Sequence, residues 1–492
     1  MFDNVRRVSR QLAAYGTADV AVLAVNFLLL PVYTRVLSTR EYGAFALLLV
    51  CEAFVKPVFR WGLDASFLRF YYDCRDDRER QTLASTIVIF LVVANGALLV
   101  GLLGAGRFVN ARLLGTLDFL FAYQLLIING FVGNFLFLPL NLLRIQERAA
   151  LFASLSFVRS FGTVLARLVL VVAFGMGVVG LVLADSIVTV LLVVALAPAL
   201  RSMVRWRFSW PTLRALLRYG LPQVPNGLLS QTMAMSDRFF LGLYLPLRDV
   251  GVYLIGNSIA AVLKFFPVAF EAAWMPFAFD SMRRADAPRL FARLATYAFA
   301  VLVVLTIAIA GLSEHLVTLM VPPEFYPAAT VVPLLAVGIA IQALTWFLAT
   351  SFNIAKRTHA YPLVTAVGAV VSIAGNLALI PRFGLLGAAM GTVAGQTAAT
   401  AAAIYFAQRA YRIPYELQRL AKLTFVALAV YAAMTLVGGP PSWPTFAARV
   451  GLLALMPLGV LALRVFDRQE LAEMRQVGAV LAAGLRRPAR TK

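Results

Sequence analysis

The stretch LSTREYGAF (37–45) returns later in the chain as LPLRDVGVY (245–253). In both stretches an arginine and an acidic residue come shortly before a glycine, and an aromatic residue lies two positions after it. The two glycines, Gly43 and Gly251, are 208 positions apart. A pattern repeated over this distance suggests that one half of the chain is a copy of the other.

Three further pairs of segments repeat in the same order and at a similar spacing. Four such matches in order would hardly arise by chance, so we infer an internal duplication, which is a feature of several transporter folds. The three pairs are YG (15–16) with YG (219–220), GVVGL (177–181) with GLLGA (384–388), and the looser match of LRIQERA (143–149) with FNIAKRT (352–358).

The composition indicates the class of protein. Of the 492 residues, 61% are hydrophobic and only 14% are charged, which is too little charge to cover a soluble protein of this length. A helix needs about 20 apolar residues to cross a bilayer. The sequence contains fourteen segments of this kind and predicts an all-α polytopic membrane protein. The predicted spans are 12–33, 43–60, 83–105, 117–140, 152–173, 177–198, 219–244, 250–279, 291–312, 330–351, 361–380, 384–407, 422–438 and 445–464.

The net charge of +21 indicates orientation in the membrane rather than binding of nucleic acid. Most basic residues fall in alternate loops, as the positive-inside rule predicts for cytoplasmic loops. This places both termini in the cytoplasm and the protein in the cytoplasmic (inner) membrane, in contact with anionic lipid. The first span is predicted to remain as an uncleaved helix. Basic residues in predicted outside segments are few: Arg35, Arg40, Arg107, Arg112, Arg248, Arg382 and Arg449.

The spans and the repeat together divide the chain into three parts. Residues 1–205 and 206–412 are predicted to form two six-helix bundles, and residues 413–492 two additional helices with a basic cytoplasmic tail. Each half starts and ends on the inside, so the repeat is parallel. Parallel repeats occur in transporters that carry their substrate between two halves.

Four stretches allow a comparison with a known family: LPVYTRVLSTREYGAFALL (30–48), WGLDASFLRFYYD (61–73), SDRFFLGLYLPLRDVGVY (236–253) and FGLLGAAMGTVAGQ (383–396). With them, most of residues 10–410 resembles the polysaccharide-transporter (O-antigen flippase) family of the multidrug/oligosaccharidyl-lipid/polysaccharide exporter superfamily. The resemblance implies a twelve-helix core with two extra helices. It also implies a transporter, not an enzyme, that moves an undecaprenyl-pyrophosphate-linked glycan to the outer leaflet. No cofactor is expected, and the expected partners are this glycan, membrane lipid, and a polysaccharide polymerase or assembly machinery.

Charged residues within predicted spans are candidates for function, because a charge at mid-bilayer costs roughly 2.5–3.5 kcal/mol on insertion scales. Lys56 and Lys264 are 208 positions apart, and each lies thirteen residues after a repeated glycine. We expect both to lie in the inner half of the membrane and to bind pyrophosphate in one cavity. Local neutralisation is the alternative, since Glu52 precedes Lys56 by four residues and Glu271 follows Lys264 by seven.

Three arginines are further candidates for substrate binding. Arg159 has no evident partner, and a guanidinium group can bind an oxyanion with two hydrogen bonds. Arg167 is a candidate too, but Asp185 on the next span lies at a similar depth, and an ion pair between them is the favoured alternative. Arg238, beside Asp237, is a candidate for substrate binding or an outer gate, with an interfacial position as the plainer interpretation.

Acidic residues within the spans are candidates for ion coupling. For Asp19, a buried and hydrogen-bonded carboxyl group is an equally good interpretation. No metal site is expected, because the two histidines and two cysteines show no metal-ligand spacing. The candidates for ion coupling are Asp19, Glu52, Asp185 and Glu271.

Three other functions remain open. An ion-coupled multidrug exporter of the same fold would line its cavity with acids, and the charges in the spans are mixed in sign. A peptidoglycan-precursor exporter would favour a basic cavity. A membrane glycosyltransferase or ligase is less favoured, because the longest predicted outside loop, residues 313–329, is short and no paired acids lie elsewhere outside.

Overall fold

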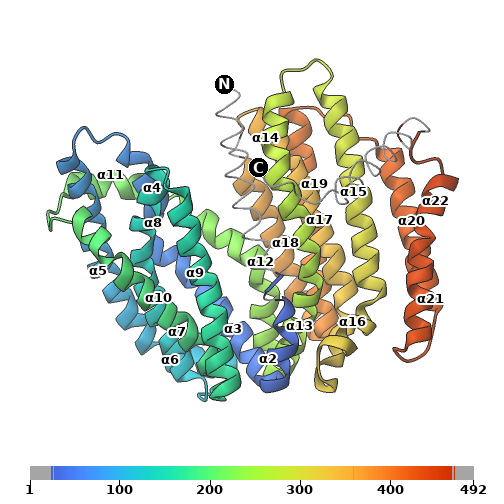
Figure 1. The fold of residues 1–492 in the computed structure, drawn as a ribbon, viewed down its shortest axis with the longest axis horizontal. Coiled ribbons are helices and arrows are strands. Elements are labelled where there is room, and N and C mark those ends of the chain that lie inside the picture. The colour runs from blue at the N-terminus through green and yellow to red at the C-terminus, as the bar shows by residue number, and fades with distance from the viewer. Residues whose placement is uncertain (1–23, 26, 358–359, 468–469, 471–492) are drawn as a thin grey trace, which may run out of the picture.

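A computed structural model describes residues 24–25, 27–357, 360–467 and 470, and all regular structure within them is helical. Figure 1 shows two groups of helices that stand apart at one end and meet at the other. The first group contains α2 (Leu30–Val36), α3 (Thr39–Arg60), α4 (Leu63–Tyr71), α5 (Asp77–Gly104), α6 (Gly106–Val109), η1 (Asn110–Leu114), α7 (Leu120–Gly133), η2 (Asn134–Leu136), α8 (Phe137–Ile145), α9 (Ala149–Arg167), η3 (Leu168–Ala173) and α10 (Gly177–Met203).

The second group follows a connecting segment and ends with the extra helices predicted at the C-terminal side. The connection is formed by α11 (Trp210–Gly220) and α12 (Gln223–Tyr244). The second group contains α13 (Leu247–Ala260), η4 (Ala261–Lys264), α14 (Phe265–Ser281), α15 (Ala287–Gly311), α16 (Ser313–Met320), η5 (Pro323–Thr330), α17 (Val332–Ile354), α18 (Ala360–Phe383), α19 (Leu385–Ala410), α20 (Leu417–Leu436), α21 (Trp443–Ala454) and α22 (Met456–Ala462).

Eleven helical stretches of the described chain are long and apolar enough to cross a membrane, and they match eleven of the predicted spans. The predicted spans 219–244 and 384–407 correspond to α12 and α19, which are long helices outside that set of eleven. Both are less apolar than the others, because α12 carries polar and charged residues and α19 is rich in alanine, glycine and threonine. The first predicted span, 12–33, lies mostly outside the described residues, so the total of fourteen stays a prediction.

The two repeated glycines of the opening motif lie against each other where α3 crosses α13. A Cβ atom at Gly43 would collide with the backbone carbonyl of Leu247, and one at Gly251 would collide with that of Thr39. Thr39 and Leu247 are themselves 208 positions apart, so the contact is reciprocal, as in an interface with two-fold symmetry. The motif is therefore repeated where the two copies pack closely, which only small residues permit.

The repeat is also visible in backbone conformation. Glu147 and Lys356, in the looser pair of repeated segments, have φ angles of 55° and 56°. Positive φ is uncommon outside glycine. In both loops the next residue donates its backbone N–H to the carbonyl five residues earlier, at 2.9 Å. Gly177 and Gly384, at the start of another repeated pair, have φ angles of 55° and 57°.

The connecting segment is divided between the two groups. The helix α11 packs against α4 and α5 of the first group, and the hydroxyl group of Ser66 donates a hydrogen bond of 2.9 Å to the carbonyl of Leu216. The next helix, α12, packs against α3, α18 and α19. The chain thus passes between the groups along α12, as Figure 1 shows. The division at residues 205 and 206 stays a prediction.

Ion pairs attach α20–α22 to the rest of the second group at both ends. At one end, Arg449, whose side chain is 9% exposed, lies 2.8 Å from the carboxylate of Glu314 at the start of α16. At the other end, Glu470 pairs with Arg419 of α20 at 3.0 Å and with Arg293 of α15 at 3.4 Å, and it accepts a hydrogen bond from Tyr297 of α15. The two extra helices are therefore fixed to α15 and α16 at both ends.

Candidate substrate cavity

A cavity of about 360 Å³ lies in the first group between the end of α3, α4, α8, α9 and α10. Its polar lining includes three arginines, Arg60, Arg144 and Arg159, together with Asp64 and the amide of Asn141. Most of the remaining wall is leucine and phenylalanine. An apolar pocket with a few charged groups that converge is typical of a ligand site.

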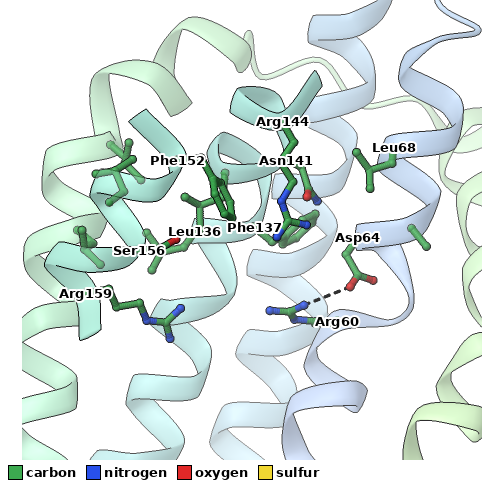
Figure 2. A pocket seen from close by; sticks show the side chains of 15 residues that line it. Arg60, Asp64, Leu68, Leu136, Phe137, Asn141, Arg144, Phe152, Ser156 and Arg159 are labelled. Carbon is green, nitrogen blue, oxygen red and sulfur yellow. Dashed lines mark hydrogen bonds and ion pairs between the residues drawn. The ribbon is translucent and has the colours of Figure 1, made fainter. Parts of the chain in front are cut away.

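The three arginines of this cavity are held differently (Figure 2). Arg60 pairs with Asp64 one helical turn later, with 3.1 Å between Nη1 and Oδ2. The guanidinium group of Arg144 lies 4.5 Å from the ring centre of Phe152. Arg159 makes no hydrogen bond or ion pair with any described residue, and Figure 2 shows its guanidinium group extending toward Arg60. Arg159 is thus the cation of this cavity that is most available to a ligand.

A second, narrower cavity of about 80 Å³ adjoins the first and shares Arg60 and Arg159 with it. Lys56 and Glu52 line this second cavity, as does Asn129. Lys56 is exposed. Lys56 and Glu52 form no ion pair, although their spacing in the sequence allowed one. The interactions of Lys56 with Arg60 and Arg159 are repulsive, and that with Glu52 is attractive.

The end of α3 is fixed by buried amide side chains, and this positions Lys56 and Arg60. The helix stops at Arg60 because Trp61 adopts a left-handed conformation, with φ of 52°. Carbonyl groups in the last turn of a helix lose their helical partners. Here the carbonyl of Phe59 accepts hydrogen bonds of 2.8 Å from both Asn95 and Asn134.

Lys264 lies in the second group, at a break between two helices. The 3-10 segment η4 separates α13 from α14. Pro267 has no N–H to donate to the carbonyl of Leu263, which explains the interruption. Lys264 is within electrostatic range of Asp237 and Arg238, and it is not among the residues that line the cavity with Lys56. The expectation that both lysines share one cavity stays a prediction.

Asp237 and Arg238 are buried inside the second group, with 5% and 7% exposure. The carboxylate of Asp237 accepts hydrogen bonds from Tyr253 at 2.7 Å and from Thr392 at 3.4 Å. The Nε atom of Arg238 is buried and has no hydrogen-bond partner among the described residues. This burial favours an interior role for Arg238 over the interfacial position considered from the sequence.

Arg167 and Asp185 form an ion pair with two hydrogen bonds between α9 and α10. The distances are 3.1 Å from Nε to Oδ1 and 2.7 Å from Nη2 to Oδ2. Their side chains are 17% and 28% exposed. This is the structural pair that the sequence left as the favoured alternative, and each group neutralises the other.

Comparison with known proteins identifies the family. A family model described as polysaccharide biosynthesis protein matches residues 8–282, which is more than half of the chain. The protein belongs to this family. No curated protein sequence matches the chain.

Solved structures show that this family member shares the fold of known transporters. It is similar to "Lipid II flippase MurJ, inward closed conformation", with a TM-score of 0.75 and 11% identity over 94% of this chain and 99% of that chain. It is also similar to an inward-facing multidrug resistance MATE family transporter of the MOP superfamily (TM-score 0.62, 14% identity, 82% and 96% covered). A third similar structure is the Vibrio cholerae MATE transporter VcmN in the bent form (TM-score 0.53, 15% identity, 82% and 97% covered). The protein is a multi-pass membrane protein of this fold.

Of the four acids predicted for ion coupling in this family member, three lie within the described residues, each in different surroundings. Glu52 lines the cavity beside Lys56, and Asp185 is paired with Arg167. Glu271 lies in the second group and forms no ion pair with Lys264. Asp19 lies outside the described residues. Ion coupling through any of them stays a prediction.

Two cations of the cavity were not recognised from the sequence. Arg60 and Arg144 lie at the inner ends of predicted spans, where basic residues are expected from topology alone. For Arg60 a signal was available, because it follows Lys56 by four residues and so lies on the same helix face. For Arg144 no local signal exists, because its place beside the cavity depends on how α8 packs against α9.

Proposed function

We propose that this family member is a flippase for an oligosaccharide or polysaccharide repeat unit linked to undecaprenyl pyrophosphate. The observation that carries the proposal is an excess of positive charge on two adjoining cavities within the membrane-spanning helices. An arginine binds phosphate oxygens with two hydrogen bonds, and a lysine adds a point charge. The cations are Lys56, Arg60, Arg144 and Arg159, and the acids beside them are Glu52 and Asp64.

Alternating access would move this substrate between the leaflets. The two groups of helices diverge at the end that holds the loop between α4 and α5, which the positive-inside rule assigns to the cytoplasm (Figure 1). They meet at the opposite end, where α3 crosses α13 at Gly43 and Gly251. This arrangement corresponds to an inward-facing state in which the lipid-linked pyrophosphate enters from the cytoplasmic leaflet. Separation of α3 from α13 would open the outer side.

Two related functions fit the observations less well. An exporter of organic cations is disfavoured, because the cavity carries more cations than acids and would repel such a substrate. A peptidoglycan-precursor exporter would use the same cationic cavity, because its substrate also carries a pyrophosphate. The family membership favours a polysaccharide repeat unit over that precursor.

The test measures, in cells that lack the protein, how much lipid-pyrophosphate-linked glycan reaches the outer leaflet. The cells are complemented with wild type, Arg159→Ala, Arg159→Lys or the control Arg409→Ala, and expression is checked by blotting. Arg409 is an exposed arginine that stacks on Tyr405 away from the cavity. We expect Arg159→Ala to lower export by about ten-fold or more, since a hydrogen bond to a charged group contributes roughly 1.5–3 kcal/mol. The Lys variant should recover part of it, and Arg409→Ala should match wild type.

Three results would contradict the proposal. Normal glycan export without the protein, together with lost drug resistance, would favour a multidrug exporter. Accumulation of peptidoglycan precursor inside the cell, with normal polysaccharide, would favour the precursor exporter. Equal export by Arg159→Ala and wild type would remove the cavity from the mechanism.

A further inference from the structure

An aromatic cluster lies on α14 and α17 of the second group, and Figure 1 shows α14 at the end of this group where the two groups stand apart. Phe270 and Trp274 follow each other at one helical turn, with their rings stacked at 5.5 Å. Phe347 of α17 packs 4.8 Å from Phe270 and 6.2 Å from Trp274. The indole N–H of Trp274 donates a hydrogen bond of 2.7 Å to Thr350, which fixes the ring.

Glu271 projects from the same helix at the edge of this cluster. Together with Phe270, Trp274, Trp346 and Phe347 it lines a recess of about 10 Å³ between α14 and α17. Glu271 is exposed, and it forms no hydrogen bond or ion pair with any described residue. The recess holds no more than about one water molecule, and Trp274 is only 7% exposed, so a ligand would lie over the half-buried rings of Phe270 and Phe347 rather than enter between them.

The recess lies at the same depth in the membrane as the cationic cavity. Glu271 is ten residues before the end of α14 at Ser281, and Arg159 is ten residues after the start of α9 at Ala149. Both helix ends adjoin loops predicted to be cytoplasmic. At about 1.5 Å per residue, both side chains therefore begin about 15 Å from the inner ends of their helices.

We propose that this recess binds a sugar ring of the lipid-linked glycan while the cationic cavity of the first group binds its pyrophosphate. The inference rests on the proposed function and assigns a different part of the substrate to each group of helices. The C–H groups of a sugar carry small positive charge and pack on the negative face of an aromatic ring. The carboxylate of Glu271 can accept hydrogen bonds from two sugar hydroxyl groups.

Charge distinguishes a sugar from the other ligand that suits aromatic rings beside a carboxylate, namely an organic cation. The first group presents Lys56, Arg60, Arg144 and Arg159, which would repel a cation brought to this depth. A neutral sugar attached to a pyrophosphate meets no such repulsion. A cationic cavity in the first group and an aromatic, acidic recess in the second group therefore match a ligand in which a pyrophosphate is joined to a sugar.

The test measures binding of two probes to the purified full-length protein. One probe is a short-chain prenyl pyrophosphate that carries one N-acetylglucosamine, and the other is the same pyrophosphate without the sugar. Variants are Glu271→Gln, Phe347→Leu and the control Phe279→Leu. Phe279 lies on the same helix and is 44% exposed, but it does not line the recess. Thermal unfolding of each variant checks that it is folded.

We expect wild type to bind the sugar-bearing probe about ten-fold more tightly than the sugar-free probe, which corresponds to about 1.4 kcal/mol. Glu271→Gln and Phe347→Leu should remove most of this difference and leave binding of the sugar-free probe unchanged. Phe279→Leu should behave as wild type. In contrast, Arg159→Ala should weaken binding of both probes.

The two proposals fail in different ways. Equal affinity of wild type for both probes, or equal weakening of both by Glu271→Gln, would overturn the sugar site alone. Binding of tetraphenylphosphonium that is lost in Glu271→Gln would assign the recess to an organic cation instead. The proposed function, and the sugar site with it, would be overturned if wild type bound neither probe. The same would follow if Arg159→Ala weakened the binding of neither probe.

Discussion

Charged side chains within the helices fall into two kinds. Arg167 and Asp185 satisfy each other with two hydrogen bonds, and Arg60 pairs with Asp64. Arg159 lines the cavity without any partner among the described residues. An unpaired cation inside a membrane protein is costly unless a ligand or water meets it. This difference separates a residue that holds two helices together from one that is available to a substrate.

The pair between Arg167 and Asp185 leads to a prediction about stability. Arg167→Ala or Asp185→Ala alone should lower the free energy of unfolding by about 1–3 kcal/mol, because a partly buried charge loses its partner. Removing both charges, with Arg167→Leu and Asp185→Leu together, should recover much of the stability and keep glycan export. Thermal unfolding of the purified protein and the export assay measure these effects. Lost export in a stable double variant would show instead that the pair contacts substrate.

The internal repeat is clearest in two helices, α3 and α13. Where α3 and α13 cross, each presents a glycine to the backbone of the other, and the reciprocal contacts are 208 positions apart. The helices then differ beyond the crossing. The helix α3 continues to Arg60, whereas α13 gives way to η4 at Ala261 because of Pro267. The repeated motif is thus followed by a continuous helix in the first group and by an interrupted helix in the second group.

The helix crossing predicts that a larger side chain will block transport. Gly43→Leu should push α3 away from the carbonyl of Leu247 and prevent the closed outer contact, so we expect glycan export to fall by ten-fold or more in an expressed protein. Gly96→Leu is the matched control, because no atom lies within 4 Å of a Cβ at Gly96. Normal export by Gly43→Leu would show that this close contact is not needed in the transport cycle.

At the scale of the whole molecule, two groups of helices are joined at one end and separate toward the other (Figure 1). The chain passes between them along α12, and α20–α22 are attached to the rest of the second group through Arg449 and Glu470. In the proposed cycle each group would move as a unit, and α3 would separate from α13 at their crossing when the outer side opens. The extra helices would then move with the second group.

The orientation of the whole molecule can be tested with single cysteines in a variant that lacks Cys51 and Cys74. Arg78→Cys lies in the first turn of α5, directly after the loop between α4 and α5, and Arg112→Cys lies between α5 and α7. We expect a membrane-impermeant maleimide to label Arg112→Cys in intact cells and Arg78→Cys only after permeabilisation. The reverse pattern would invert the topology and the direction in which the groups of helices open.

The sequence by itself determined the class of protein, most of its spans and the internal repeat. These features depend on properties that run along the chain, namely apolar length, the placement of basic residues and the recurrence of a motif. Lys56 and Arg159 could be selected for the same reason, because a charge inside an apolar segment is conspicuous without any knowledge of its neighbours.

Only the tertiary structure decided which of these residues meet. It showed that Arg167 reaches Asp185, that Arg60 and Arg144 join Arg159 at one cavity, and that Gly43 lies against α13. Each of these contacts depends on the rotation of a helix about its axis and on the neighbour against which it packs. In a chain that is apolar on nearly every helix face, hydrophobic periodicity does not reveal that rotation, so packing between distant helices decides it.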